Sequence, residues 1–311
     1  MAQYSHLDRI IADAINLGPA RVAVAYPCSV SSLEAAIAAH RLGLVTPILV
    51  GPRSRIGQIA REKDIDLGHM EFRESGEDPI AAAGASVELC KGGQADLIMK
   101  GSLHSDELLA SVVGRDSGLR TDRRVSHAFI FDTPSYSKPL LMADCVVNIT
   151  PGLIDKRDIT QNAIDLAHVL GIARPYVAVL SAVETVNPAI PGTIDAAALS
   201  KMAQRGQITG AIVDGPLAFD IAISAEAARI KGIDTLPLER PDIIIMPTLE
   251  AGNMLYKQLV YLAKAECAGV VLGTRVPIVL TSRADSEKSR VASCALAVLQ
   301  VRAKASARSS K

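Results

Sequence analysis

The fold class is decided first by residues 21–50, RVAVAYPCSVSSLEAAIAAHRLGLVTPILV. A short apolar run rich in β-branched residues stands at each end of this segment, and a stretch of helical length lies between them. Ser31 and Glu34 have the spacing of a capping box, and Gly43 stands where a helix often places its first left-handed residue after the C-terminus. The segment therefore predicts a strand, a helix and a second strand.

The same pattern recurs along the chain. The apolar runs are Arg21–Tyr26, Pro47–Val50, Asp96–Met99, Ala128–Asp132, Cys145–Ile149, Tyr176–Ser181, Ala211–Asp214, Asp242–Pro247, Gly269–Gly273 and Pro277–Ser282. Most of them show no alternation, which is typical of parallel strands buried on both faces, and amphipathic stretches separate many of them. The expected class is α/β with mainly parallel sheets.

The length of 311 residues predicts two domains, at roughly 150 residues for each. No internal repeat stands out, and no linker rich in Pro or Ser divides the chain. The polar stretch Gly114–Arg124 is the strongest break in the strand pattern. We therefore expect the first crossing between domains there.

Composition narrows the function classes. Lys plus Arg is 33 and Asp plus Glu is 33, so no net charge attracts nucleic acid or an anionic membrane, and aromatic residues make up only 3%. The five cysteines are widely spaced and odd in number, which favours reduced thiols.

The N-terminus lacks the pattern of a signal peptide, and no run approaches the ~18 apolar residues of a membrane span. A cytoplasmic protein is expected.

Several catalytic signatures are absent from the sequence. No Gly-Lys dipeptide occurs, which excludes a P-loop, and no two glycines are separated by one residue, which excludes the dinucleotide fingerprint. The G-x-S-x-G elbow, paired histidines at i, i+4 and cysteine clusters are also missing. Zinc chemistry and hydrolysis by a serine triad therefore have no support.

Ligands in parallel α/β sheets bind beyond the carboxyl ends of the strands, so polar residues that follow each run are the candidates. The last run ends in Thr281, Ser282 and Arg283, and a helix follows Asp285 and Ser286. Free N–H groups, a hydroxyl and a guanidinium at one point suit a phosphate or a carboxylate. The equally weighted alternative is a helix capped by Asp285 or Ser286, with Arg283 in solvent.

Two carboxylates, Asp214 and Asp220, surround an expected tight turn after another run. Carboxylates there can orient a substrate or bind a metal ion. The alternative is an acid that ties down its own turn through backbone N–H groups, which is the commoner role.

Three more strand ends carry candidates. Lys100 follows the run Asp96–Met99, where a solvated lysine is the default, and Asn148 follows the residues Cys145–Val147. Gly252 permits a close backbone approach after a third run, and Asn253 and Lys257 follow it. Capping of the next helix is the alternative role for Asn253.

These motifs together resemble the phosphate acetyltransferase and phosphate butyryltransferase family. The matching segments are Asp-Gly-Pro-Leu at 214–217, Ala-Gly-Asn-Met-Leu-Tyr-Lys at 251–257, Thr-Ser-Arg at 281–283, Lys-Gly at 100–101 and Ala-Asp-Cys-Val-Val-Asn at 143–148. The resemblance implies reversible transfer of an acyl group between the sulfur of coenzyme A and inorganic phosphate, which gives an acyl phosphate. It covers most of the chain.

The resemblance also implies two α/β domains that flank a cleft, similar to the isocitrate and isopropylmalate dehydrogenases. Because the family's C-terminal helix returns to the first domain, we expect one domain from residues 1–122 plus 274–311 and a second from residues 123–273. The family expectation further includes a homodimer, with acyl-CoA and inorganic phosphate as the partners and neither nucleic acid nor membrane among them. Coenzyme A enters as substrate, and no tightly bound cofactor or metal is expected.

Roles follow from the resemblance. Arg283 would bind phosphate or the thioester carbonyl, and Ser282 would steady the reacting thiol. The acetyltransferase branch has a carboxylate seven residues after that serine, where this chain has Ser289, so Asp285 is nominated as the base that takes the thiol proton. The expected substrate-binding residues are Lys100, Asn148, Asp214, Asn253, Lys257 and Thr281.

A second departure lies within Leu108–Ser111, where an arginine common in the family is replaced and Arg115 or Arg120 can substitute. Two alternatives stay open. A metal- and NAD-dependent dehydrogenase on the related scaffold has only Asp214 and Asp220 in its support. A non-catalytic relative that binds coenzyme A or another metabolite would explain the departures. The acyl group stays open among acetyl, propionyl and butyryl.

Overall fold

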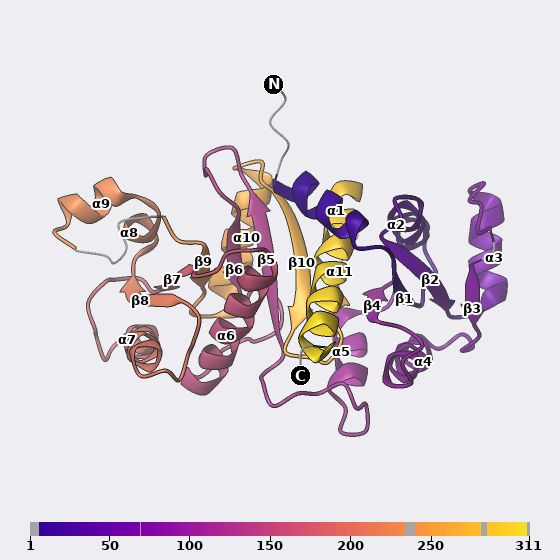
Figure 1. Ribbon diagram of the computed structural model, residues 1–311, viewed down its shortest axis with the longest axis horizontal. Coiled ribbons are helices and arrows are strands. Elements are labelled where there is room, and N and C mark those ends of the chain that lie inside the picture. Colours follow the sequence, from indigo (N-terminus) through magenta and orange to yellow (C-terminus); the bar gives the residue numbers. More distant parts are fainter. Residues whose placement is uncertain (1–5, 69, 234–239, 281–284, 310–311) are drawn as a thin grey trace. The chain divides into compact units, whose positions relative to one another are not determined.

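The computed structural model describes residues 6–68, 70–233, 240–280 and 285–309. Helices and strands alternate along most of the chain and most strand pairs are parallel, so the α/β class with mainly parallel sheets is confirmed. The chain forms two compact units (Figure 1). The first unit is Met1–Arg123 with Ala268–Lys311, and the second unit is Arg124–Cys267. The domain boundaries at 122/123 and 273/274 stay a prediction.

The first unit has the strand order β3-β2-β1-β4-β11-β10, and its neighbouring strands are parallel except for the antiparallel pair of β10 and β11. Its strands are β1 (Ala20–Ala25), β2 (Val45–Val50), β3 (Glu71–Arg73), β4 (Leu97–Lys100), β11 (Ile278–Val279) and β10 (Glu266–Leu272), of which the first two residues belong to the second unit. Its helices are α1 (His6–Asn16), α2 (Val30–Arg41), α3 (Arg53–Glu62), α4 (Pro79–Lys91), α5 (Ser105–Val113) and α11 (Glu287–Ser309).

Helix α2 follows the predicted segment, with one correction at its start. Ser29 is the N-cap: its hydroxyl accepts a hydrogen bond from the Ser32 backbone N–H, and the Ser32 hydroxyl accepts one from the Ser29 N–H. The expected capping box of Ser31 and Glu34 is therefore wrong by two residues, because the serine pair already satisfies the first free N–H groups. Gly43 has a φ of 75° and follows the helix as expected.

The second unit has the strand order β5-β6-β9-β7-β8, in which only the pair of β5 and β6 is antiparallel among the described residues. Its strands are β5 (Ser126–Asp132), β6 (Leu140–Ala143), β7 (Tyr176–Leu180), β8 (Ile212–Leu217) and β9 (Ile243–Ile245). Its helices are α6 (Leu153–Val169), α7 (Pro191–Gln204), α8 (Phe219–Ile223), α9 (Ala225–Ile230) and α10 (Leu249–Tyr261).

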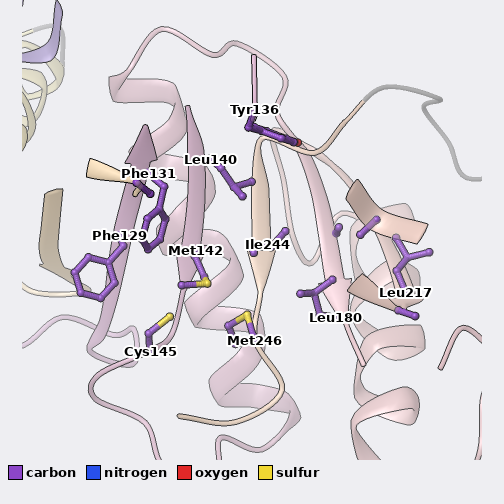
Figure 2. Packing of buried hydrophobic residues seen from close by; sticks show 14 of the residues in the cluster. Phe129, Phe131, Tyr136, Leu140, Met142, Cys145, Leu180, Leu217, Ile244 and Met246 are labelled. Carbon is purple, nitrogen blue, oxygen red and sulfur yellow. The ribbon is translucent and has the colours of Figure 1, made fainter. Parts of the chain in front are cut away.

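Helix α10 packs against the sheet through the hydrophobic core of the second unit. Figure 2 shows Phe129 and Phe131 of β5 beside Met142 of β6, and the spacing of two residues places both phenylalanines on one face of β5. The ring of Tyr256 from α10 stacks on Phe129, with ring centroids 4.3 Å apart and an interplanar angle of 8°. Stacked aromatic pairs contribute about 0.5–1.5 kcal/mol beyond the burial of their apolar area, so this contact helps to hold α10 against the sheet.

The expectation of a strand at Cys145–Ile149 is wrong. The strand is Leu140–Ala143, and the chain turns directly after it. The Asp144 carboxylate accepts hydrogen bonds from the backbone N–H groups of Val146 at 2.8 Å and Val147 at 3.0 Å. Because those N–H groups point at one side chain, they cannot form a ladder with a neighbouring strand.

All five cysteines are buried, and none of them forms a disulfide bond. Within the described ranges, none of the helices combines the length and the apolar character that a membrane crossing requires.

Candidate active site

The carboxyl ends of three parallel strands meet at one edge of the first unit. Ala25 of β1 pairs with Lys100 of β4, and Val279 of β11 pairs with Met99 of β4. Thr281, Ser282 and Arg283 follow β11 in the sequence but lie outside the described residues. Their predicted roles therefore stay predictions, whereas the strand that leads into them does end at the edge where ligands bind in such sheets.

The turn after β4 passes close to the turn after β1. Lys100 is half-buried, and its Nζ donates to the carbonyl oxygen of Leu103 at 3.2 Å. Gly101 donates its N–H to the Ala25 carbonyl at 2.8 Å, and a Cβ at this position would lie 2.4 Å from that same oxygen. Only glycine fits so close to another backbone. The structure thus places Lys100 at the edge and assigns it a contact within its own turn.

Three serine hydroxyls gather at the same edge, and the sequence reasoning missed them as site residues. The Ser29 and Ser32 hydroxyls are 2.9 Å apart, and the Ser32 hydroxyl is 3.4 Å from that of Ser102. They surround the N-terminus of α2, where hydroxyl and backbone donors favour negative charge. The signal in the sequence was the serine-rich stretch directly after the first apolar run, which has the same position relative to its strand as the predicted site residues.

The start of α11 supports one of the capping alternatives. The Ser286 hydroxyl accepts from the Ser289 backbone N–H at 3.1 Å, and the Ser286 and Ser289 hydroxyls are also 3.1 Å apart. Ser289 is buried, so this position, where the resemblance implied a carboxylate in the acetyltransferase branch, serves the helix terminus here. Asp285 is half-buried just before the helix, and its role as the base stays a prediction.

Arg290 connects the starts of α11 and α2. Its Nη1 donates to the carbonyl oxygen of Ser31 at 3.1 Å. Asp285 therefore precedes a helix that is tied to the serine-bearing terminus of α2. Serine hydroxyls at a helix N-terminus that faces the carboxyl ends of parallel strands suit an anion.

In the second unit, the predicted residue Asn148 belongs to a network around Asp144. The Asp144 carboxylate accepts from the Asn148 backbone N–H at 3.3 Å and from its Nδ2 at 2.5 Å. Burial raises the pKa of the Asp144 carboxyl, and the hydrogen bonds from Val146, Val147, Asn148 and His127 oppose that rise. Both carboxylate oxygens of Asp144 thus accept hydrogen bonds within the protein, and Asn148 donates two of them.

Helix α10 packs against the same loop. A Cβ on Gly252 would lie 2.7 Å from the Asp144 carbonyl oxygen and 3.0 Å from the Cys145 sulfur, which confirms the predicted close approach. Asn253 is half-buried, and its Nδ2 is 3.5 Å from the Cys145 carbonyl oxygen. The structure therefore brings two predicted residues, Asn148 and Asn253, to one loop.

Capping by Asn253 is wrong, because Thr248 is the N-cap of α10 and accepts from the Ala251 backbone N–H at 3.3 Å. Asn253 lies inside the helix, so its amide is not needed at the terminus. Lys257 is exposed, with its Nζ 5.5 Å from the ring centroid of Tyr256.

The expectation that Asp214 and Asp220 surround a tight turn is wrong. Strand β8 continues to Leu217, so Asp214 lies within the strand and Asp220 lies in α8. Asp214 accepts from the Gly215 backbone N–H at 2.9 Å, and burial raises the pKa of its carboxyl. Asp220 pairs with Lys231 at 2.9 Å. Among the described residues, no three His, Cys, Asp or Glu side chains gather into a possible metal site, so these acids give the dehydrogenase alternative no geometric support.

The fold and these strand ends define a class of α/β protein with polar residues at the carboxyl ends of mainly parallel strands. The sequence profile of the family described as Phosphate acetyl/butaryl transferase matches residues 73–298. The chain belongs to this family of transferases. The resemblance read from the strand-end motifs is confirmed, and the protein is an enzyme of the acyltransferase class.

Individual relatives agree with this assignment. A phosphate acetyltransferase of Rhizobium meliloti is 54% identical over 298 residues, which cover 96% of this chain and 94% of the relative. A phosphate butyryltransferase of Clostridium acetobutylicum is 43% identical, with 90% of this chain and 92% of the relative covered.

Solved structures agree as well. A branched-chain phosphotransacylase from Enterococcus faecalis V583 superposes with a TM-score of 0.78 at 30% identity, covering 91% of this chain and 99% of that one. A 4-hydroxythreonine-4-phosphate dehydrogenase from Klebsiella pneumoniae has a TM-score of 0.56 at 13% identity, covering 91% of this chain and 99% of that one. The latter likeness concerns the fold alone, and it confirms the expected relation to a dehydrogenase scaffold.

Proposed function

We propose that this protein transfers an acetyl group reversibly between the sulfur of coenzyme A and inorganic phosphate. The observation that carries the choice of acetyl is the identity of 54% with a phosphate acetyltransferase along nearly the full length of both chains, against 43% with a butyryltransferase. Propionyl and butyryl groups are the competitors, since one methylene changes discrimination by only about 1–3 kcal/mol.

The reaction needs no covalent bond to the enzyme. A phosphate oxygen attacks the thioester carbonyl carbon, and the new C–O bond leaves a tetrahedral intermediate with an oxyanion. Collapse of the intermediate breaks the C–S bond, and the coenzyme A sulfur leaves with the electron pair and takes up a proton. Positioning of the phosphate and stabilisation of the oxyanion supply most of the catalysis in such a step.

The residues assigned by resemblance have consistent roles in this scheme. Arg283 binds the phosphate or the carbonyl oxygen, Ser282 steadies the sulfur, and Asp285 exchanges the thiol proton. The hydroxyls of Ser29 and Ser32 lie at the start of α2 at the same sheet edge, where a helix N-terminus favours an anion. Coenzyme A acts as a substrate in this scheme, and no tightly bound cofactor takes part. A homodimer stays a prediction.

The test is phosphate-dependent release of free thiol from acetyl-, propionyl- and butyryl-CoA. We expect the highest kcat/KM with acetyl-CoA and a loss of turnover in Arg283→Ala. The matched control is Arg9→Ala, because the Arg9 side chain is 81% exposed on α1 and should not affect turnover. A higher kcat/KM for butyryl-CoA would refute the acetyl preference. Binding of coenzyme A without turnover of any thioester would refute catalysis and favour a binding protein.

A further inference from the structure

Arg124 is held at the start of the second unit through its backbone and through its Nε. Its backbone N–H donates to the Asp158 carboxylate at 2.9 Å, and its carbonyl oxygen accepts from Asn162 Nδ2 at 2.9 Å. Its Nε donates to Asn148 Oδ1 at 2.7 Å. An exposed arginine normally loses rotamer entropy when it binds a ligand, and these contacts remove much of that cost before binding.

The residue that holds the guanidinium is itself fixed. Asn148 is buried, and its Nδ2 donates to the Asp144 carboxylate at 2.5 Å and to the Val125 carbonyl oxygen at 2.9 Å. These two acceptors determine which way the amide faces, so Oδ1 must point at Arg124. A chain of three side chains therefore sets the direction of one guanidinium.

The outer part of this guanidinium remains available. The Arg124 side chain is 55% exposed, and no described residue accepts a hydrogen bond from its two terminal nitrogens. The nearest carboxylate, that of Asp155, is 3.7 Å from Nε, which is too long for a hydrogen bond. The terminal N–H groups form the planar pair that binds two oxygens of a phosphoryl group at once.

Arg124 also lies at the edge of the sheet where ligands bind. Strand β5 is antiparallel to β6, and Ala128 near the start of β5 pairs with Ala143 at the carboxyl end of β6. Arg124 precedes β5 and so lies beside the carboxyl ends of the parallel strands of this unit, as Asn148 does. Ligands of parallel α/β sheets bind at this edge.

We propose that Arg124 binds a phosphoryl group of a substrate through its terminal nitrogens, and that Asn148 is the positioning residue that aims it. The proposal rests on the proposed acyl transfer to phosphate, which supplies two sources of that group. One is a phosphate of coenzyme A, and the other is inorganic phosphate. Asn148, which the sequence suggested as a direct substrate ligand, acts in this scheme through Arg124.

The test uses Arg124→Gln, which leaves a neutral amide donor and removes both the positive charge and the pair of terminal N–H groups. Loss of a paired contact to a charged group is worth about ten- to hundredfold in affinity. We expect the KM of one substrate to rise by that factor with kcat changed less than threefold. The control is Arg205→Gln, because Arg205 is exposed at the C-terminus of α7, beside the opposite edge of the sheet. A defect in folding would lower the active fraction and kcat instead.

Two arms distinguish the sources. If Arg124 binds coenzyme A, the KM for acetyl-CoA rises and the defect disappears with S-acetylpantetheine, which has no phosphate. If Arg124 binds inorganic phosphate, the KM for phosphate rises with either thioester. Unchanged KM values for both substrates in an active Arg124→Gln enzyme would overturn the proposal.

Calorimetric titration with coenzyme A, and separately with inorganic phosphate, tests the same contact without turnover. A wild-type protein that binds either compound yet does not turn over would refute the proposed function. A weaker affinity in Arg124→Gln would still support the role of Arg124 in that case, and an equal affinity for both compounds would refute it.

Discussion

Gly252→Ala measures how tightly α10 is pressed against the loop after β6. Alanine in a helix interior is favoured over glycine by about 1 kcal/mol, so the substitution would stabilise a helix with free space around it. Here the new methyl group would lie 2.7 Å from the Asp144 carbonyl oxygen and 3.1 Å from the Cys145 Cα. Overpacking of a filled site costs about 1–3 kcal/mol.

The upper end of that range applies at Gly252. Two of the three nearest atoms belong to backbone, and the Asp144 side chain holds this loop through the N–H groups of Val146 and Val147. A cost of about 3 kcal/mol, less a gain of about 1 kcal/mol from helix propensity, leaves a net loss of about 2 kcal/mol in the free energy of unfolding.

The assay is urea denaturation followed by circular dichroism, with Gly84→Ala as the matched control. Gly84 lies inside α4, and a Cβ there meets no atom within 4 Å. The control should gain up to about 1 kcal/mol, because only helix propensity changes. If Gly252→Ala proved as stabilising as Gly84→Ala, the close approach of α10 to the Asp144–Cys145 loop would be refuted.

Two further predictions concern the interior of the second unit. Burial lowers the pKa of His127 from 6.5 to about 3. As the pH drops below 6.5, the imidazole takes up a proton in the unfolded chain but not in the folded protein, so the free energy of unfolding falls. Between pH 7 and 5 this amounts to about 2 kcal/mol, and His127→Leu should flatten the pH dependence of urea unfolding by that amount; an unchanged slope would contradict the burial. Asn148→Asp places an acceptor against the Asp144 carboxylate and the Val125 carbonyl, which should cost about 3–5 kcal/mol at pH 7 and less at lower pH, as one of the two carboxyls takes up a proton. A cost relative to the wild-type protein that does not fall at lower pH would contradict that pairing.

The sequence was sufficient for features that depend on neighbouring residues. Apolar runs without alternation predicted strands such as Tyr176–Leu180 and Ile243–Ile245, because burial on both faces leaves the same mark wherever a strand lies. A close backbone approach at Gly252 was likewise predicted from its place after a strand end. Where a side chain competes for the backbone, this reasoning failed, as at Cys145–Ile149, where Asp144 takes the N–H groups.

By itself, the sequence determined the α/β class, the family and the strand ends that carry polar residues, because each of these features depends on residues that are close together in the sequence. Only the tertiary structure decided which of those residues meet. The contact of Arg124 with Asn148 spans 24 positions, and the approach of Asn253 to Cys145 spans 108. Strand order sets such contacts, and it arises from pairing between distant segments whose energies depend on the whole sheet. For this reason Asn148 could be placed at a site from the sequence, whereas its partner Arg124 could not.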